Sequence, residues 1–386
     1  MLVRRLALHD FRNIADLAIE PEAGLNLVVG PNAQGKTSLL ESLHVLATTK
    51  SHRTARDVEL VRFGAPATRC LTTIERGGSS AGETADLEVA IAAAGSTEPD
   101  RKRVRIDGVR QNRTVDLLGR LQVVLFSVND VDMVRGEPTE RRRFLDYAIS
   151  QVSPRYALAL GAYRKALEQR NRLLKDVRRR AVDADSLDAW SEALAVHGAR
   201  IVERRADFLA RLAPHAAAMH GLLSDGVEKL TVAYKPSFAL PAEASVEAAV
   251  DAFREALARV RSEEIARGTT LAGPQRDDVM LSVGNGEGQT VEVRNFGSQG
   301  QQRTAALALR MAERVLAEEL SGDPPVVLLD DVLSDLDERR RSQVLAHALQ
   351  RGGQTFLTTT ETSVLPPDTV DAARVWRLRA GRIETA

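Results

Sequence analysis

Eight consecutive residues near the start of the chain have the types and the order of a phosphate-binding loop. The glycines of such a loop let backbone N–H groups close around an anionic phosphate at the start of a helix. Lys36 is expected to reach the β- and γ-phosphates of ATP, and the Thr37 hydroxyl is expected to ligate Mg²⁺. The alternative is a glycine-rich turn with a stray lysine. The residues that match the pattern GxxxxGK[ST] are Gly30, Pro31, Asn32, Ala33, Gln34, Gly35, Lys36 and Thr37.

Two adjacent carboxylates follow an apolar run far along the chain. The run is Val326–Leu329, and the carboxylates are Asp330 and Asp331. This is the form of a Walker B segment, in which Asp330 would hold Mg²⁺ and Asp331 would be the catalytic residue that orients or deprotonates the attacking water. The alternative is a strand that runs into an acidic turn. Its pairing with a phosphate loop favours the nucleotide interpretation.

A third group of residues opens a predicted helix shortly before that strand. A serine and small residues at a helix start expose N–H groups that can bind an anion, although serine at this position is common. Placed between a phosphate loop and a Walker B strand, the group resembles the signature of ABC-type ATPases. The candidate signature residues are Ser298, Gln299, Gly300 and Gln301. The residues that resemble the D-loop of the same superfamily are Ser334, Asp335, Leu336 and Asp337.

The periodicity of apolar residues predicts the elements that must position these motifs. The flanks alternate short apolar runs with helical patterns, which indicates α/β structure. Between them, apolar residues recur every three to four positions up to residue 177 and again over 187–208. This predicts two helices of about 25 residues in an antiparallel hairpin reaching roughly 35–40 Å. A third amphipathic helix is expected over 246–265. The predicted segments of the flanks are Leu25–Val29, Lys36–Ala47, Val123–Phe126, 279–283 and 300–320.

Length and composition restrict the class of protein. The chain has 386 residues, which suggests two to three domains, and 44% hydrophobic with 27% charged residues excludes wholesale disorder. No apolar run approaches the roughly 20 residues of a membrane span, and no secretion signal is expected at the start. The single cysteine, Cys70, excludes a disulfide framework. We therefore expect a cytoplasmic protein with no membrane partner.

The charge distribution is informative in one place only. The 53 basic and 53 acidic residues cancel, but residues 135–180 are enriched in arginine and lysine. Either this stretch forms solvated faces of long helices, or it contacts nucleic-acid phosphates without regard to sequence. Aromatic residues make up only 4% of the chain, which argues against platforms for base stacking. If the second interpretation holds, the candidate DNA-binding residues are Arg178, Arg179 and Arg180 at the hairpin tip.

Taken together, the motifs and the spacing between them resemble the RecF family of bacterial recombination mediators, within the SMC-like ABC ATPase superfamily. The resemblance runs from about residue 2 to residue 385. Gln275 stands where that family usually has histidine. Four further segments carry the resemblance, namely Asp10–Asn13, Phe126–Ser127, Glu140–Asp146 and Gly273–Asp278.

The resemblance implies a fold and a function. The expected fold is an α/β ABC-type ATPase head built from both ends of the chain, 1–130 and 269–386, with an inserted helical arm over 131–268. The cofactors would be ATP and Mg²⁺, and the signature would cap the partner's nucleotide in an ATP-dependent homodimer. The partners would be single-stranded and gapped or double-stranded DNA, with RecR and RecO. The implied roles are DNA replication, recombinational gap repair and the SOS response.

Two other functions remain open at this stage. One is an ABC-type ATPase of a different scaffold or of a defence system, and the other is a phosphate-loop metabolic enzyme. The signature and the D-loop argue against the metabolic enzyme. A weak ATPase stimulated by DNA and used as a switch would favour the RecF-like interpretation.

Overall fold

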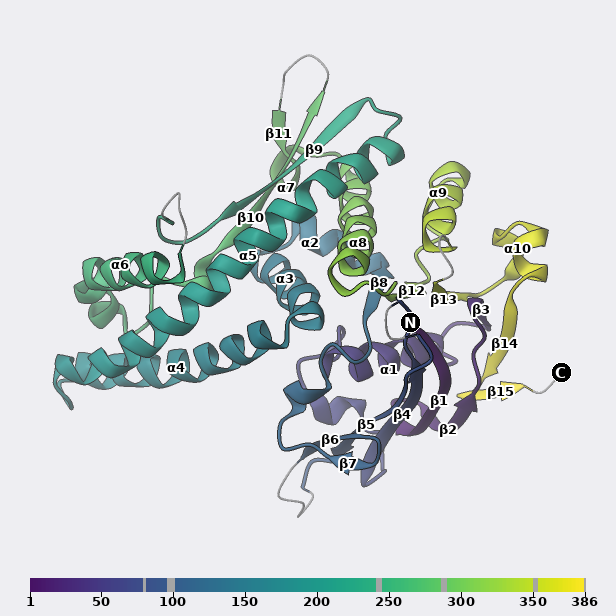
Figure 1. The fold of residues 1–386 in the computed structure, drawn as a ribbon, viewed down its shortest axis with the longest axis horizontal. Helices are drawn as coiled ribbons and strands as arrows, with labels where there is room; N and C mark the ends of the chain where they lie inside the picture. Colours follow the sequence, from purple (N-terminus) through teal and green to yellow (C-terminus); the bar gives the residue numbers. More distant parts are fainter. Residues whose placement is uncertain (79–80, 96–100, 241–244, 286–289, 350–352, 385–386) are drawn as a thin grey trace. The chain divides into compact units, whose positions relative to one another are not determined.

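The computed structural model describes residues 1–78, 81–95, 101–240, 245–285, 290–349 and 353–384 (Figure 1). It divides into two compact units. The first joins Met1–Asp130 to Leu307–Ala386, and the second is Val131–Ala306. The first unit is therefore built from both ends of the chain, with the second unit inserted between them.

The first unit contains two six-stranded sheets that share one hydrophobic core with helix α1 (Lys36–Thr48). One sheet is wholly antiparallel, and in the other only the edge strand β15 is antiparallel to its neighbour. The antiparallel sheet has the order β2 (Ile14–Ile19), β1 (Leu2–Phe11), β4 (Ala67–Glu75), β5 (Thr84–Ala92), β6 (Lys102–Ile106) and β7 (Val109–Arg110). The mixed sheet has the order β15 (Arg382–Glu384), β14 (Arg374–Arg379), β3 (Gly24–Val29), β13 (Gln354–Thr359), β12 (Val326–Asp330) and β8 (Val123–Ser127).

The parallel strands place the predicted motifs at one edge of the mixed sheet. β12 and β13 are buried along their whole length, as expected for strands covered on both faces. Because β3, β12 and β13 run in the same direction, the residues that follow their carboxyl ends meet. The remaining helices of this unit are α9 (Glu338–Leu349) and α10 (Pro367–Asp371), and α8 (Gln299–Ser321) starts in the second unit and ends in the first.

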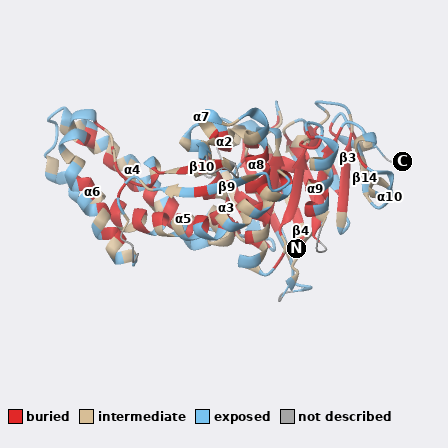
Figure 2. Ribbon diagram, turned by 90° about the horizontal axis from the view of Figure 1, so that it is seen from above, coloured by how far each residue is buried: buried red, intermediate tan, exposed pale blue. Residues whose placement is uncertain are grey.

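Long helices dominate the second unit. α4 and α5 are antiparallel, because Arg170 Nε donates to Ser191 Oγ at 3.0 Å while Arg205 Nε donates to the Tyr156 hydroxyl at 3.0 Å. Figure 2 shows buried and exposed residues alternating along both helices. α5 has 36 residues, longer than expected, because it continues past the hairpin to pack on β9. The helices are α2 (Asp132–Arg135), α3 (Pro138–Val152), α4 (Pro154–Arg178), α5 (Asp188–Leu223), α6 (Val246–Arg267) and α7 (Val293–Phe296).

A small sheet moves the boundary of the inserted unit. β9 (Glu228–Lys235) pairs with β10 (Asp278–Asn285), which pairs with β11 (Thr290–Glu292). From the sequence, β10 and β11 are expected in the ATPase head, and the insertion is expected to end at residue 268. The compact unit extends to Ala306 instead, because both strands are hydrogen-bonded into a sheet that starts inside the insertion.

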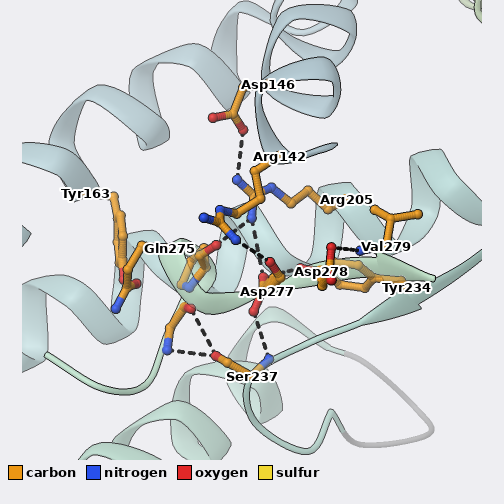
Figure 3. Close-up of polar contacts among 12 residues, drawn as sticks. Arg142, Asp146, Tyr163, Arg205, Tyr234, Ser237, Gln275, Asp277, Asp278 and Val279 are labelled. Atoms are coloured by element: carbon orange, nitrogen blue, oxygen red, sulfur yellow. Dashed lines mark hydrogen bonds and ion pairs between the residues drawn. The ribbon is translucent and has the colours of Figure 1, made fainter. Parts of the chain in front are cut away.

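A buried polar network holds α3, α5 and the segment just before β10 together (Figure 3). The Arg205 guanidinium donates to Asp146 Oδ1 at 2.8 Å, to the Pro274 carbonyl oxygen at 2.8 Å and to Asp277 Oδ2 at 3.3 Å. Arg142 Nη1 donates to the Asp277 carbonyl oxygen at 2.7 Å. The segments Glu140–Asp146 and Gly273–Asp278 are thus connected by hydrogen bonds, directly and through Arg205. These polar groups stabilise the fold of the second unit.

Candidate nucleotide-binding site

The phosphate loop leaves β3 and enters α1 with the backbone that such a loop needs. Gly35 has φ +110° and Ala33 has φ +63°, both left-handed, so the loop curls over the start of the helix. A Cβ on Gly30 would overlap the carbonyl oxygen of Leu378, so only glycine fits there. The first turn of α1 contains no acidic residue, and its N-cap is glycine. Its free N–H groups are therefore suited to an anion.

Lys36 is folded back onto the loop. Its Nζ donates to the carbonyl oxygens of Gly30 at 2.6 Å and Pro31 at 2.9 Å. Burial lowers the pKa of Lys36, and the nearby carboxylates of Asp331 and Asp330 oppose that shift. Phosphate oxygens would be stronger partners for the ammonium than neutral carbonyls.

Asp330 joins the two halves of the chain. Its Oδ1 accepts hydrogen bonds from Thr37 Oγ1 at 3.0 Å and from Thr358 Oγ1 at 2.8 Å. Burial raises the pKa of Asp330, and these two hydroxyls partly offset the shift. A hydroxyl and a carboxylate are the hard oxygen ligands that Mg²⁺ takes together with substrate phosphates. Mg²⁺ bound here would take its other ligands from nucleotide oxygens and waters. Within the described ranges no group of three or more His, Cys, Asp or Glu residues could hold a metal.

Asp331 faces a different environment from its neighbour. It has φ +52°, and its N–H donates to Thr358 Oγ1 at 3.0 Å. This left-handed backbone turns the chain out of β12, so that the Asp331 side chain lines the cavity beside the loop. Ser334 Oγ of the predicted D-loop donates to the Asp331 carbonyl oxygen at 2.8 Å.

The rest of the D-loop is fixed by one arginine. Ser334, Asp335 and Asp337 are exposed, whereas Leu336 is buried. The Arg341 guanidinium donates to the carbonyl oxygens of Leu333 at 3.2 Å, Leu336 at 3.0 Å and Val364 at 3.1 Å. The D-loop is therefore tied to the segment that follows β13.

A cavity of about 580 Å³ lies against the phosphate loop, and sequence analysis missed several of its residues. Arg12 binds the fully buried carboxylate of Glu41 through two hydrogen bonds of 3.0 and 2.6 Å, and Arg53 Nη1 donates to the same carboxylate at 3.2 Å. Glu41 was the available signal, since an acidic residue on an apolar helix needs cationic partners. Phe63 is fully exposed at the cavity and had no comparable signal. The residues outside the loop that line the cavity are Arg12, Asn13, Ser38, Arg53, Glu59, Val61, Phe63, Asp331 and Thr358.

The predicted signature residues begin α8. Ser298 Oγ accepts from the Gln301 N–H at 3.2 Å, and Gln301 Oε1 accepts from the Ser298 N–H at 2.8 Å. This reciprocal pair is a capping box. A Cβ on Gly300 would meet only Ser298 Oγ, at 3.8 Å, so nothing within the described chain requires glycine there.

The candidate DNA-binding arginines lie at the end of the α4–α5 hairpin, as predicted. Arg178 is the last residue of α4, and Arg180 has φ +58° in the turn that follows. All three, Arg178, Arg179 and Arg180, are exposed, and none forms an ion pair with any residue that the structure describes. The DNA-binding role of these arginines stays a prediction.

None of the described helices is both long enough and apolar enough to cross a membrane.

Comparisons with known proteins agree over the whole length. The family model described as "RecF/RecN/SMC N terminal domain" matches residues 2–375. The DNA replication and repair protein RecF of Synechocystis sp. is 41% identical over 392 residues, covering 100% of this chain and 98% of the relative. The protein of the same name from Bacillus subtilis is 37% identical over 384 residues, covering 99% and 100%.

Solved structures give the same result at the level of the fold. A structure of the recombination mediator protein RecF with ATP, in the RecFOR pathway, has a TM-score of 0.87 at 30% identity, covering 100% of this chain and 97% of the other. The Smc head domain of Pyrococcus furiosus bound to the C-terminal domain of ScpA has a TM-score of 0.55 at 15% identity. The second likeness concerns the fold alone, and together the two confirm the predicted α/β ATPase head.

Proposed function

The chain belongs to the RecF family of DNA replication and repair proteins, and we propose that it acts in DNA repair as an ATP-dependent DNA-binding switch. ATP binds the phosphate loop with Mg²⁺ held by Thr37 and Asp330. Binding drives head-to-head dimerisation, the dimer clamps DNA, and slow hydrolysis resets the cycle. RecR and RecO as partners, a part in SOS induction and a cytoplasmic location belong to the same proposal.

The observation that carries the proposal is the contact between the phosphate loop and the Walker B strand. Thr37 and Asp330 are 293 residues apart in sequence and 3.0 Å apart in space, beside a cavity of about 580 Å³. Such a volume is typical of sites for small organic ligands. The start of α1, Lys36 and Thr37 line this cavity, and the Asp330 carboxylate is hydrogen-bonded to the Thr37 hydroxyl. These are the hydrogen-bond donors and metal ligands that a nucleoside triphosphate with Mg²⁺ requires.

Dimerisation is supported by the unexplained glycine of the signature. Gly300 is exposed and has open space around its Cα, so a side chain would fit within the monomer. A glycine that its own chain does not need is expected where another molecule approaches the backbone closely. We assign that role to the γ-phosphate of a nucleotide bound by a partner copy, with Ser298 and the N–H groups of Gly300 and Gln301 as donors.

Slow hydrolysis follows from the sparse catalytic apparatus. Asp331 is one methylene shorter than glutamate and is the sole carboxylate proposed to act on the water. Thr360 and Glu361 follow β13, where ABC transporters place a histidine. General-base assistance contributes roughly a factor of 10²–10⁴, so a poorly supported base gives turnover well below about 10 per second. ATP then acts mainly by shifting populations of conformations and assemblies.

Sedimentation with ATP and with ADP tests the proposal. ATP should convert wild type from monomer to dimer, and ADP should not. Lys36→Met should abolish ATP binding, whereas Ser298→Arg should bind ATP and stay monomeric because a bulky cation blocks the cap. Asp331→Asn should bind ATP and accumulate as a dimer on DNA. A dimer that forms without nucleotide, or hydrolysis at ordinary enzyme rates without DNA, would refute the switch.

DNA contact by the arm has its own test. Replacing Arg178, Arg179 and Arg180 with glutamine should lower the salt dependence of DNA affinity by up to about three units if each contacts a phosphate. An unchanged salt dependence would show that these arginines do not contact DNA and are only solvated residues at the hairpin tip.

A further inference from the structure

The edge hairpin of the mixed sheet presents an arginine-rich outer face. The hairpin consists of β14 and β15, and it packs its inner face on the hydrophobic core through Trp376, Leu378 and Ile383. On the outer face Arg377 lies opposite Glu384, and Arg379 lies directly opposite Arg382. This face therefore carries three arginines and one glutamate.

Two of the three arginines on this face have no ion-pair partner among the described residues, and the third has only a long ion pair. Arg379 is 77% exposed and reaches Glu384 only at 3.6 Å, while Arg377 and Arg382 are exposed and form no ion pair with any described residue. Like charges directly opposite each other on neighbouring strands destabilise a sheet. The Arg379–Arg382 pair is thus unfavourable in the free protein and would be relieved by an anion placed over both.

The turn of the same hairpin is attached to the phosphate loop. Ala380 has φ +48° and Gly381 has φ +73°, so both central residues are left-handed, as in a type I′ turn. The Ala380 N–H donates to Gln34 Oε1 at 2.6 Å, and the Gly381 N–H donates to the Gln34 carbonyl oxygen at 3.0 Å. Alanine is strained in this conformation, and the two successive N–H groups reach Gln34 because the turn adopts it.

Two steric contacts strengthen the attachment. A Cβ on Gly381 would lie 2.7 Å from the Asn13 carbonyl oxygen, and a Cβ on Gly30 would overlap the Leu378 carbonyl oxygen. The hairpin and the phosphate loop therefore touch at two glycines as well as through Gln34. Because close-packed interiors transmit strain, a displacement of the hairpin would also displace the phosphate loop.

We propose that the outer face of the β14–β15 hairpin, through Arg377, Arg379 and Arg382, binds the backbone phosphates of DNA, and that its turn transmits this binding to the phosphate loop through Gln34. The inference rests on the proposed DNA-binding function and adds a second contact surface and a route of coupling. Exposed arginines suit phosphodiesters, which they bind with bidentate geometry. Because coupling between two ligands is reciprocal, DNA should raise the affinity for ATP by the same factor as ATP raises the affinity for DNA.

The test compares three triple variants of the full chain. The first replaces Arg377, Arg379 and Arg382 with glutamine, and the second replaces them with lysine. The third is a matched control that makes the same charge change at exposed arginines held in ion pairs. Its positions are Arg4, Arg69 and Arg113, which pair with Glu75 at 2.6 Å, Glu88 at 3.2 Å and Asp116 at 2.9 Å.

Affinity for a fluorescein-labelled gapped duplex is measured by anisotropy over a range of salt concentrations. The glutamine variant should lose up to about three units of salt dependence. Its affinity at roughly 0.1 M salt should fall about tenfold for each phosphate that is no longer neutralised. The lysine variant should keep the wild-type salt dependence because it keeps the charge. The matched control should behave like wild type. Equal losses in the glutamine variant and the control would overturn the proposal, since net charge would then explain both.

ATP affinity, measured with and without the same duplex, tests the coupling. Without DNA the glutamine variant should match wild type, and with DNA its enhancement factor should fall towards one. A variant that binds DNA more weakly but keeps the wild-type factor would refute transmission through the turn. Polyglutamate that competes with DNA on wild type but not on the glutamine variant would assign the face to an acidic protein instead. Wild type that binds no DNA in any nucleotide state would refute the proposed function itself.

Discussion

The buried imidazole of His347 should make the first unit lose stability as the pH falls below about 6.5. His347 lies on α9, is 6% exposed, and has its Nε2 at 3.2 Å from the Met311 carbonyl oxygen on α8. Burial, and after it the charge of Arg314, lower the pKa of His347 to about 4. In the unfolded chain the imidazole has its ordinary pKa of about 6.5.

The size and sign of the effect follow from this difference. Between pH 6.5 and 4 the unfolded chain binds a proton that the folded chain does not accept, so acid favours unfolding. Each pKa unit corresponds to about 1.4 kcal/mol, and the full difference approaches about 3 kcal/mol. The contribution is fully present above about pH 6.5 and is lost progressively towards pH 4.

Urea unfolding at several pH values measures the effect. Trp190→Phe leaves Trp376 as the single tryptophan, so that fluorescence reports on the first unit. In that background His347→Gln removes the titrating group. Between pH 6.5 and 5 the parent should lose about 1.6 kcal/mol more unfolding free energy than the His347→Gln variant. Carboxylates titrate equally in both proteins and cancel. Parallel pH profiles would show that His347 is not held neutral by the fold.

Three further predictions follow from single positions. Phe63→Ala should weaken ATP binding about tenfold, because stacking on a base contributes roughly 1–3 kcal/mol; calorimetry should find tripolyphosphate binding unchanged, and an equal loss for both ligands would exclude stacking. Arg205→Met should cost the second unit about 3–5 kcal/mol by leaving the buried Asp277 carboxylate without its arginine partner. Urea unfolding followed through Trp190 in a Trp376→Phe background measures this loss. Gly30→Ala should prevent ATP binding because the added Cβ has no room, whereas Gly300→Ala should bind ATP but fail to dimerise. Equal ATP affinities of the two variants would contradict the steric argument.

The phosphate loop and the Walker B strand could be located from sequence because each is a local pattern with a local cause. Glycine supplies the backbone freedom at Gly35, and a continuous apolar run predicts the buried strand β12. Their meeting could also be anticipated, since a phosphate loop needs a carboxylate for its metal ion. The confirmed α/β fold follows from the same flanking patterns.

Other parts could not be predicted because their cause is not local. The length of α5 and the boundary at Ala306 depend on strand pairing between β9 and β10, which no period within either segment encodes. The segment Gly273–Asp278 carries the family resemblance in sequence. In the structure, however, its Asp277 carboxylate accepts hydrogen bonds from Arg205 and Tyr234 in a buried network. Phe63 reaches the cavity only because the chain near Val61 bridges back to Phe11 in β1.

The two adjacent carboxylates at the end of β12 lie in different surroundings, which favour different roles in nucleotide binding and hydrolysis. Asp330 points back between the threonine hydroxyls of α1 and β13, where burial raises its pKa and a bound cation would favour the charged form. Asp331 is turned by its left-handed backbone into the open cavity, where a water can reach it. Identical side chains one residue apart thus separate into a metal ligand and a base because environment sets the role of a carboxylate. Asp330→Asn should therefore weaken Mg²⁺-dependent ATP binding, whereas Asp331→Asn should spare binding and stop hydrolysis. Equal effects of the two substitutions on ATP affinity would show that the division of roles is wrong.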